Sequence, residues 1–169
     1  MRVYIPATLA MLQQFVADRL IHARSGTAFA VTPALREAYS EGDEDELSEV
    51  ALRDAALASL RLLSGEQATP DVDALPPRRA VLVAEVDGAT VRPDLDDAVV
   101  RLAGPVAIDD VIAAYVDNAD AEPAVLTAVE VIDEADLGDE DAELAVGDAQ
   151  DHDLAWYAPS ELPFLLELL

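Results

Sequence analysis

The sequence predicts an α/β fold, with α+β as the alternative, in which helices pack on a mixed sheet of about five strands. Three observations predict it. Short apolar, β-branched segments alternate with longer segments of helical periodicity. Residues 80–86 are almost continuously apolar, as in a strand covered on both faces. The hydrophobic fraction of 52% can supply one core, so we expect a single domain over residues 1–169, with the loop 66–77 as a candidate sub-boundary.

The first part of the chain carries clear signals for where helices begin and end. Thr8 is a candidate N-cap, and Pro33 suits the first position of a helix, where its missing N–H costs little. Asp43, followed three residues later by Glu46, resembles a capping box, and Gly65 is a candidate stop. The predicted elements are strands over 2–6 and 27–31 and helices over 9–21, 33–39 and 40–65.

The second part contains shorter elements separated by glycine and proline. Asp87-Gly88 and Gly104-Pro105 are typical of turns, and Gly138 divides two helical segments. Pro163 limits the length of the last helix. The predicted elements are strands over 80–86, 98–102, 112–116 and 154–157, a helical turn at 109–110, and helices over 122–135, 139–149 and 160–168.

The acidic charge is concentrated in the second half of the chain. Residues 1–79 carry 12 acids and 8 arginines, a net charge of −4, whereas residues 80–169 carry 23 acids and 2 arginines, a net charge of −21. Such a potential disfavours nucleic acids and anionic membranes as partners and favours a basic protein. The oligomeric state stays open.

Several kinds of chemistry are excluded by residue types that the chain lacks. It contains no cysteine and no lysine, which removes disulfides, thiolate metal sites, Schiff-base chemistry and a P-loop lysine. It contains no Gly-x-Ser-x-Gly and no Gly-x-Gly-x-x-Gly sequence, so we expect neither a cofactor nor a metal. No signal peptide is apparent, and the apolar residues 162–169 are too few to span a bilayer, so we expect a cytoplasmic protein.

Four segments carry a resemblance to a known family. They are MRVYIPATL at residues 1–9, AFAVTPALREAY at 28–39, residues 45–63, and GDEDAELAVGDAQDHDLAWYA at 138–158. The chain resembles a small uncharacterised family of intracellular proteins from high-GC actinobacteria. The resemblance implies no activity, cofactor or catalytic residue. It also implies a simple reason for the missing lysine, because high-GC genomes favour arginine codons.

Three groups of residues are candidates for function. In the first, His152 between Asp151 and Asp153 could act as a general base, or could bind a divalent metal with help from the acids at 139–143, although a surface histidine in a loop explains the same residues and is the interpretation we favour. The second is an acidic surface that suits an arginine-rich partner, or serves simply as a solvated helix start. It comprises Asp133, Glu134, Asp136, Asp139, Glu140, Asp141 and Glu143.

The third group lies near the Thr32-Pro33 turn. Arg36, Glu37 and Tyr39 follow the second predicted strand, and Arg2 and Tyr4 lie on the first. An arginine at such a strand end could hold an anionic small molecule, although pairing of Arg36 with a nearby acid is the simpler expectation.

Three functions remain open on this basis. The favoured hypothesis is a non-enzymatic accessory or regulatory protein that binds a basic protein through its acidic half. The first alternative is a small enzyme using carboxylates and His152, which predicts a pocket where His152 meets Arg36 or Arg2. The second alternative is an acidic mimic of nucleic acid that occupies a basic groove.

Overall fold

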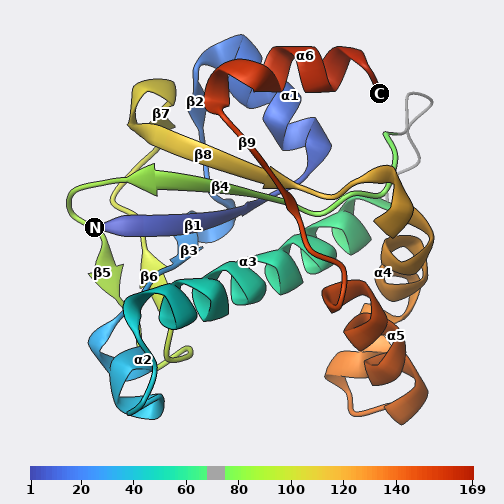
Figure 1. The fold of residues 1–169 in the computed structure, drawn as a ribbon, viewed down its shortest axis with the longest axis horizontal. Helices are drawn as coiled ribbons and strands as arrows, with labels where there is room; N and C mark the ends of the chain where they lie inside the picture. Colours follow the sequence, from blue (N-terminus) through green and yellow to red (C-terminus); the bar gives the residue numbers. More distant parts are fainter. Residues whose placement is uncertain (68–74) are drawn as a thin grey trace.

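The chain forms a seven-stranded sheet with helices on both faces (Figure 1). The computed structural model describes residues 1–67 and 75–169. The strand order is β5-β6-β3-β1-β4-β8-β9, and β2 and β7 form a separate two-stranded sheet. The strands are β1 (Arg2–Ala7), β2 (Leu20–Ile21), β3 (Thr27–Phe29), β4 (Ala80–Glu85), β5 (Thr90–Val91), β6 (Val99–Arg101), β7 (Val106–Ala107), β8 (Val111–Val116) and β9 (Ala155–Tyr157).

The helices divide between the two faces of the sheet. Figure 1 shows α1 and α6 on one face and the long α3 on the other, with α4 and α5 packed together near the C-terminal end of α3. The helices are α1 (Leu9–Asp18), α2 (Pro33–Ala38), α3 (Glu44–Gln67), α4 (Glu122–Asp136), α5 (Glu140–Gln150) and α6 (Leu162–Glu167). Short 3-10 turns occupy Arg24–Gly26, Ile108–Asp110, Ala119–Ala121 and Pro159–Glu161. Within residues 1–67 and 75–169, no helix combines the length and apolar character needed to cross a bilayer.

The predicted α/β class is confirmed, but the sheet is larger than predicted and is not mixed. It has seven strands instead of about five, and all of its neighbouring strands are antiparallel. The helices α2 and α3 connect β3 to β4, which run in the same direction but are separated by β1, antiparallel to both. Alternation of strands and helices therefore does not imply parallel neighbours here. The candidate sub-boundary at 66–77 falls mostly on residues 68–74, outside the described residues.

Local capping sets most helix ends where the sequence predicts them. The Thr8 hydroxyl accepts a hydrogen bond from the Met11 N–H at 3.2 Å, and the Asp43 carboxylate accepts one from the Glu46 N–H at 2.9 Å. Two predicted ends are wrong. The first helix stops at Asp18 because Arg19 adopts a left-handed conformation (φ 62°) and the next two residues pair with β7. Gly65 does not stop α3, which continues to Gln67.

Alternation along the strands sorts side chains between two layers of core. On β1, Val3 and Ile5 are fully buried on the face covered by α1 and α6, whereas Tyr4 lies on the α3 face. One buried hydroxyl fixes α3 against the sheet. Ser59 donates to the Ala7 carbonyl at 2.6 Å and accepts from the Ala80 N–H at 3.1 Å, so it satisfies the ends of both β1 and β4.

A buried ion pair joins the beginning of β4 to the end of β8. Arg79 and Asp117 are 1% and 0% exposed, and the guanidinium donates from Nε and Nη2 to the two carboxylate oxygens at 2.8 and 2.7 Å. The Arg79 N–H also donates to the same carboxylate at 2.8 Å. The remaining guanidinium donors reach the Gln150 side-chain oxygen at 2.9 Å and the His152 carbonyl at 2.7 Å. This ion pair therefore anchors both strands and the chain that leaves α5.

Removal of one partner should leave an uncompensated buried charge. We expect Arg79→Met or Asp117→Leu alone to lower the free energy of unfolding by about 3–5 kcal/mol, measured by urea denaturation at neutral pH. The double variant should lose clearly less than the sum of the single losses, because both charges are then gone. Additive losses would contradict the assignment of this ion pair as a coupled unit.

Candidate functional site

A cleft opens beside α3, where the helix leaves part of the sheet uncovered. The long helix packs mainly on β1, β3 and β4, whereas β8 and β9 lie at one edge of the sheet. The space between them is a cleft of about 350 Å³, called here the α3 cleft. Its lining comes from β1, α3, the residue before β4, β8, the end of α5 and the segment that follows α5. The lining residues are Tyr4, Asp45, Ser48, Glu49, Leu52, Arg53, Ala56, Arg79, Tyr115, Gln150, His152, Asp153 and Leu154.

One stripe of α3 forms a wall of the cleft. Its members recur every three or four residues, which places them on the same side of a helix. The stripe begins with the carboxylates of Asp45 and Glu49, continues through Leu52 and ends at the buried Ala56. The cleft is therefore acidic toward the N-terminal end of α3 and apolar further along the helix.

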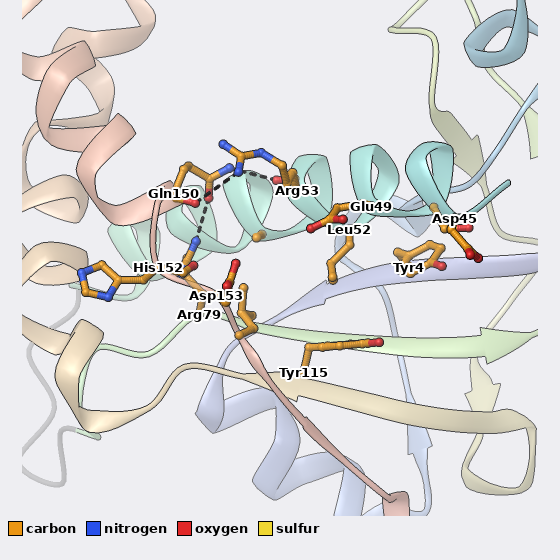
Figure 2. A pocket seen from close by; sticks show the side chains of 13 residues that line it. Tyr4, Asp45, Glu49, Leu52, Arg53, Arg79, Tyr115, Gln150, His152 and Asp153 are labelled. Atoms are coloured by element: carbon orange, nitrogen blue, oxygen red, sulfur yellow. Dashed lines mark hydrogen bonds between the residues drawn. The ribbon is translucent and has the colours of Figure 1, made fainter. Parts of the chain in front are cut away.

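Two tyrosines from the sheet face these carboxylates. Tyr4 on β1 is 7% exposed, and Tyr115 on β8 is partly exposed. Figure 2 shows both rings on the sheet side of the cleft, opposite the Asp45 and Glu49 side chains of α3. Burial raises the pKa of Tyr115, as do the neighbouring Tyr4 and Glu49, while Arg2 opposes this effect. We call Tyr4, Asp45, Glu49 and Tyr115 the carboxylate–tyrosine end of the cleft.

The other end of the cleft is occupied by internal hydrogen bonds. The Arg53 guanidinium is turned toward the Gln150 carbonyl at 3.4 Å, and the Gln150 amide donates to the Arg53 carbonyl at 3.0 Å (Figure 2). The side-chain oxygen of Gln150 also accepts a hydrogen bond from the Arg79 guanidinium, whose charge is compensated by Asp117. Arg53 and Arg79 are therefore engaged in contacts within the protein.

Asp45 and Glu49 have no such compensation. Over residues 1–67 and 75–169, no ion pair involves either carboxylate, and residues 68–74 contain no lysine or arginine. Like charges four residues apart on a helix repel each other. A cation placed between them would relieve this repulsion and could also contact the tyrosine rings.

The chemistry of the cleft lining indicates which class of cation it suits. The part of the chain that the structure describes contains no group of three or more histidines and acids arranged to hold a metal. The lining instead combines two carboxylates with aromatic rings, which suits an organic cation such as a guanidinium or an ammonium group.

The comparisons place the chain in a family but supply no activity. A family of unknown function, DUF6912, matches residues 1–166. The chain belongs to this family. The DUF6912 match agrees with the resemblance of the sequence to an uncharacterised family. The searches of curated proteins and of solved structures found no match.

His152 lies beside the cleft but does not face its carboxylate–tyrosine end. It sits in the turn between α5 and β9, and its carbonyl accepts a hydrogen bond from Arg79. Figure 2 shows the imidazole pointing away from Glu49, Tyr4 and Tyr115. His152 is among the residues that line the cleft, but neither Arg36 nor Arg2 lines it, so this is not the pocket predicted where His152 meets one of these arginines.

The other predicted binding residues lie outside the α3 cleft. Arg36 is exposed and pairs with Glu44, as the simpler expectation had it, and Arg2 pairs with Glu85 at 2.8 Å. Tyr39, 49% exposed, follows α2. Of the strand-end group, only Tyr4 lines the cleft.

The predicted acidic surface gathers at the junction of α4 and α5. Asp139 caps α5 by accepting hydrogen bonds from the N–H groups of Asp141 and Ala142. Glu140, Asp141 and Glu143 are exposed in the first turn, where the helix dipole favours them. Figure 1 shows α5 and α2 near opposite ends of α3, so these acids are not brought together with Arg36 and Tyr39.

A separate group of carboxylates lies elsewhere around α3. Asp54 is partly buried, and its pKa is raised to about 6 by burial and by Asp96, with Asp97 adding to the effect and Arg53 and Arg61 opposing it. The folded protein therefore holds a proton on Asp54 at pH values where the unfolded chain, with an ordinary pKa of 3.8, has lost it.

Neutralising Asp54 should stabilise the protein at neutral pH. We expect Asp54→Asn to raise the free energy of unfolding at pH 7 by about 1 kcal/mol, a modest value because solvent screens this partly accessible group. The advantage should shrink as the pH falls below 6 and vanish at about pH 3, where Asp54 is protonated in both folded and unfolded chains. Urea denaturation across this range measures it. Glu130→Gln, on the exposed side of α4, removes the same charge and should show no such pH dependence.

Proposed function

We propose that this protein is a binding protein for a basic protein partner, and that the carboxylate–tyrosine end of the α3 cleft receives an arginine or lysine side chain of that partner. The observation that carries the proposal is the pair Asp45 and Glu49, two uncompensated carboxylates facing Tyr4 and Tyr115. Charge and aromatic surface together select for an organic cation.

The individual contributions at this site are modest but act together. A cation over a tyrosine face contributes about 0.5–1 kcal/mol when exposed and about 2 kcal/mol when desolvated. Each partly exposed carboxylate contributes up to about 1 kcal/mol. A guanidinium is planar, so it can lie against a ring while its N–H groups donate to carboxylates. Arginine is therefore the preferred side chain.

The charge of the whole chain adds a longer-range contribution. A formal net charge of −25 attracts a basic partner and speeds its approach, although salt screens this attraction over about 8 Å at 0.15 M. The acids at the start of α5 contribute to this general field. In addition to this long-range attraction, the cleft places two carboxylates and two aromatic rings around one position for a cation.

The cleft favours binding over the catalytic alternative. A general base must come within about 3 Å of the proton that it abstracts. The His152 ring points away from the carboxylates and tyrosines that would hold a substrate at the acidic end of the cleft. His152 contributes its carbonyl to Arg79 and thereby positions the segment beside the cleft.

The contribution of the cleft can be separated from that of overall charge by two matched double variants. Asp45→Asn with Glu49→Gln and Asp141→Asn with Glu140→Gln each remove two exposed charges from the first two turns of a helix, but only the first pair lines the cleft. With a hexa-arginine peptide in about 0.15 M salt, the first variant should bind about tenfold more weakly, since two contacts of about 0.7 kcal/mol are lost. The second should change affinity by less than about twofold.

Isothermal titration calorimetry measures both affinities, and the fluorescence of Trp156, the only tryptophan, gives a second reading without a label. Trp156 pairs with Tyr115 across β8 and β9, so it lies close to the cleft. Equal losses in the two variants would show that only overall charge matters. Absence of binding by the natural chain even at low salt would also overturn the proposal.

A further inference from the structure

The edge strand β9 is exposed next to the α3 cleft. Among the described residues, β9 pairs with β8 on one side and has no strand on the other. Figure 1 shows it in the part of the chain that runs from α5 to α6. An edge strand presents unpaired N–H and C=O groups, and proteins usually shield it with charged side chains, proline or a covering element. The three residues of β9 carry neither charge nor proline.

The one large side chain that β9 presents to solvent lies on the same face as the cleft. Trp156 is 56% exposed and stands directly opposite Tyr115 in the antiparallel pair. Its neighbour Tyr157 points to the other face, where it packs against the core beneath α1 and α6. An exposed indole beside a lining tyrosine extends the aromatic surface from the cleft to the edge of the sheet.

Charge decides what kind of chain this edge accepts. Asp151 and Asp153 precede β9 and are exposed, and Glu161 follows it and is also exposed. A second copy of this chain would bring the same acids and another formal charge of −25 to the edge, so self-pairing is opposed by repulsion. A basic segment meets the opposite situation, because its side chains find carboxylates at both ends of the strand.

From these observations we infer that an extended basic segment of the partner adds to the free edge of β9 as a further strand and lays alternate arginine or lysine side chains over Trp156 toward the cleft. The inference rests on the proposed function and specifies its mode of binding. Main-chain hydrogen bonds to β9 supply affinity, and side chains that project every second residue supply selectivity. A cation over the exposed indole adds a further contact.

Alternation of basic residues is the first consequence to test. A capped hexapeptide of sequence Arg-Thr-Arg-Thr-Arg-Thr places all three arginines on one face of a strand, whereas Arg-Arg-Arg-Thr-Thr-Thr divides them between two faces. Both peptides have the same charge and composition. Calorimetry with the full chain should show at least about fivefold tighter binding of the alternating peptide. Equal affinities would overturn the proposed mode.

Backbone methylation tests the strand pairing directly. In a strand, the N–H groups of alternate residues point to opposite edges, so either the arginine or the threonine amides of the alternating peptide face β9. We expect N-methylation of one set to weaken binding about tenfold or more and methylation of the other set to change it by less than about threefold. Equal effects of the two methylated peptides, whether both bind or both fail, would overturn strand addition.

These outcomes are distinct from those that test the cleft. If the peptides methylated on alternate sets bind differently but Asp45→Asn with Glu49→Gln has no effect, the edge is used and the cleft is not. If that double variant weakens binding but both methylated peptides behave alike, the cleft is used and strand addition is wrong. Sedimentation of the natural chain gives the remaining outcome, because a dimer that Trp156→Ala abolishes would assign the edge to a second copy and overturn the inference.

Discussion

The arrangement of the whole C-terminal part depends on the buried pair Arg79 and Asp117. Both charges lie out of contact with water, and their position at the ends of β4 and β8 fixes the two strands relative to each other. The same guanidinium holds Gln150 and the His152 carbonyl. Burying two charges is costly, and such a pair often contributes little net stability compared with apolar residues. Its role here is geometric, since it directs the chain leaving α5 past the α3 cleft and into β9.

The surface keeps a large negative charge because 35 acids outnumber ten arginines, and several of these arginines already pair with an acid. The chain has ten arginines and no lysine, and six ion pairs join arginines to acids among the described residues. Arg53, which could have reached Glu49 one helical turn earlier, is turned instead toward Gln150. Six of the ten arginines therefore already pair with an acid, and within residues 1–67 and 75–169 none of these pairs involves Asp45 or Glu49. An excess of acids attracts positively charged molecules and repels other copies of the same chain.

Local sequence signals predicted most helices and strands, but they did not predict features that depend on residues far apart in the sequence. Thr8 and Asp43 were identifiable as caps because capping depends on a few adjacent residues. The strands β2, β5 and β7 were missed because two residues are too short to show alternation. Asp45 was interpreted as a helix-start acid, which it is, but no local pattern indicates that it also faces Tyr115 from a distant strand. His152 was singled out for its chemistry, yet the structure uses its carbonyl.

The cleft and the free edge have a common origin in the size of the sheet relative to α3. A helix is about 10 Å wide and strands are spaced about 4.8 Å apart, so a single helix covers only two or three strands. Here α3 lies mainly over β1, β3 and β4, so the α3 face of β8 and β9 is left partly open at the edge. An uncovered edge invites pairing with any extended chain. Because exposed acids flank β9, electrostatic repulsion discourages acidic chains there while attraction favours basic ones. In the proposed mode of binding, the same charges would oppose self-association and favour a basic partner.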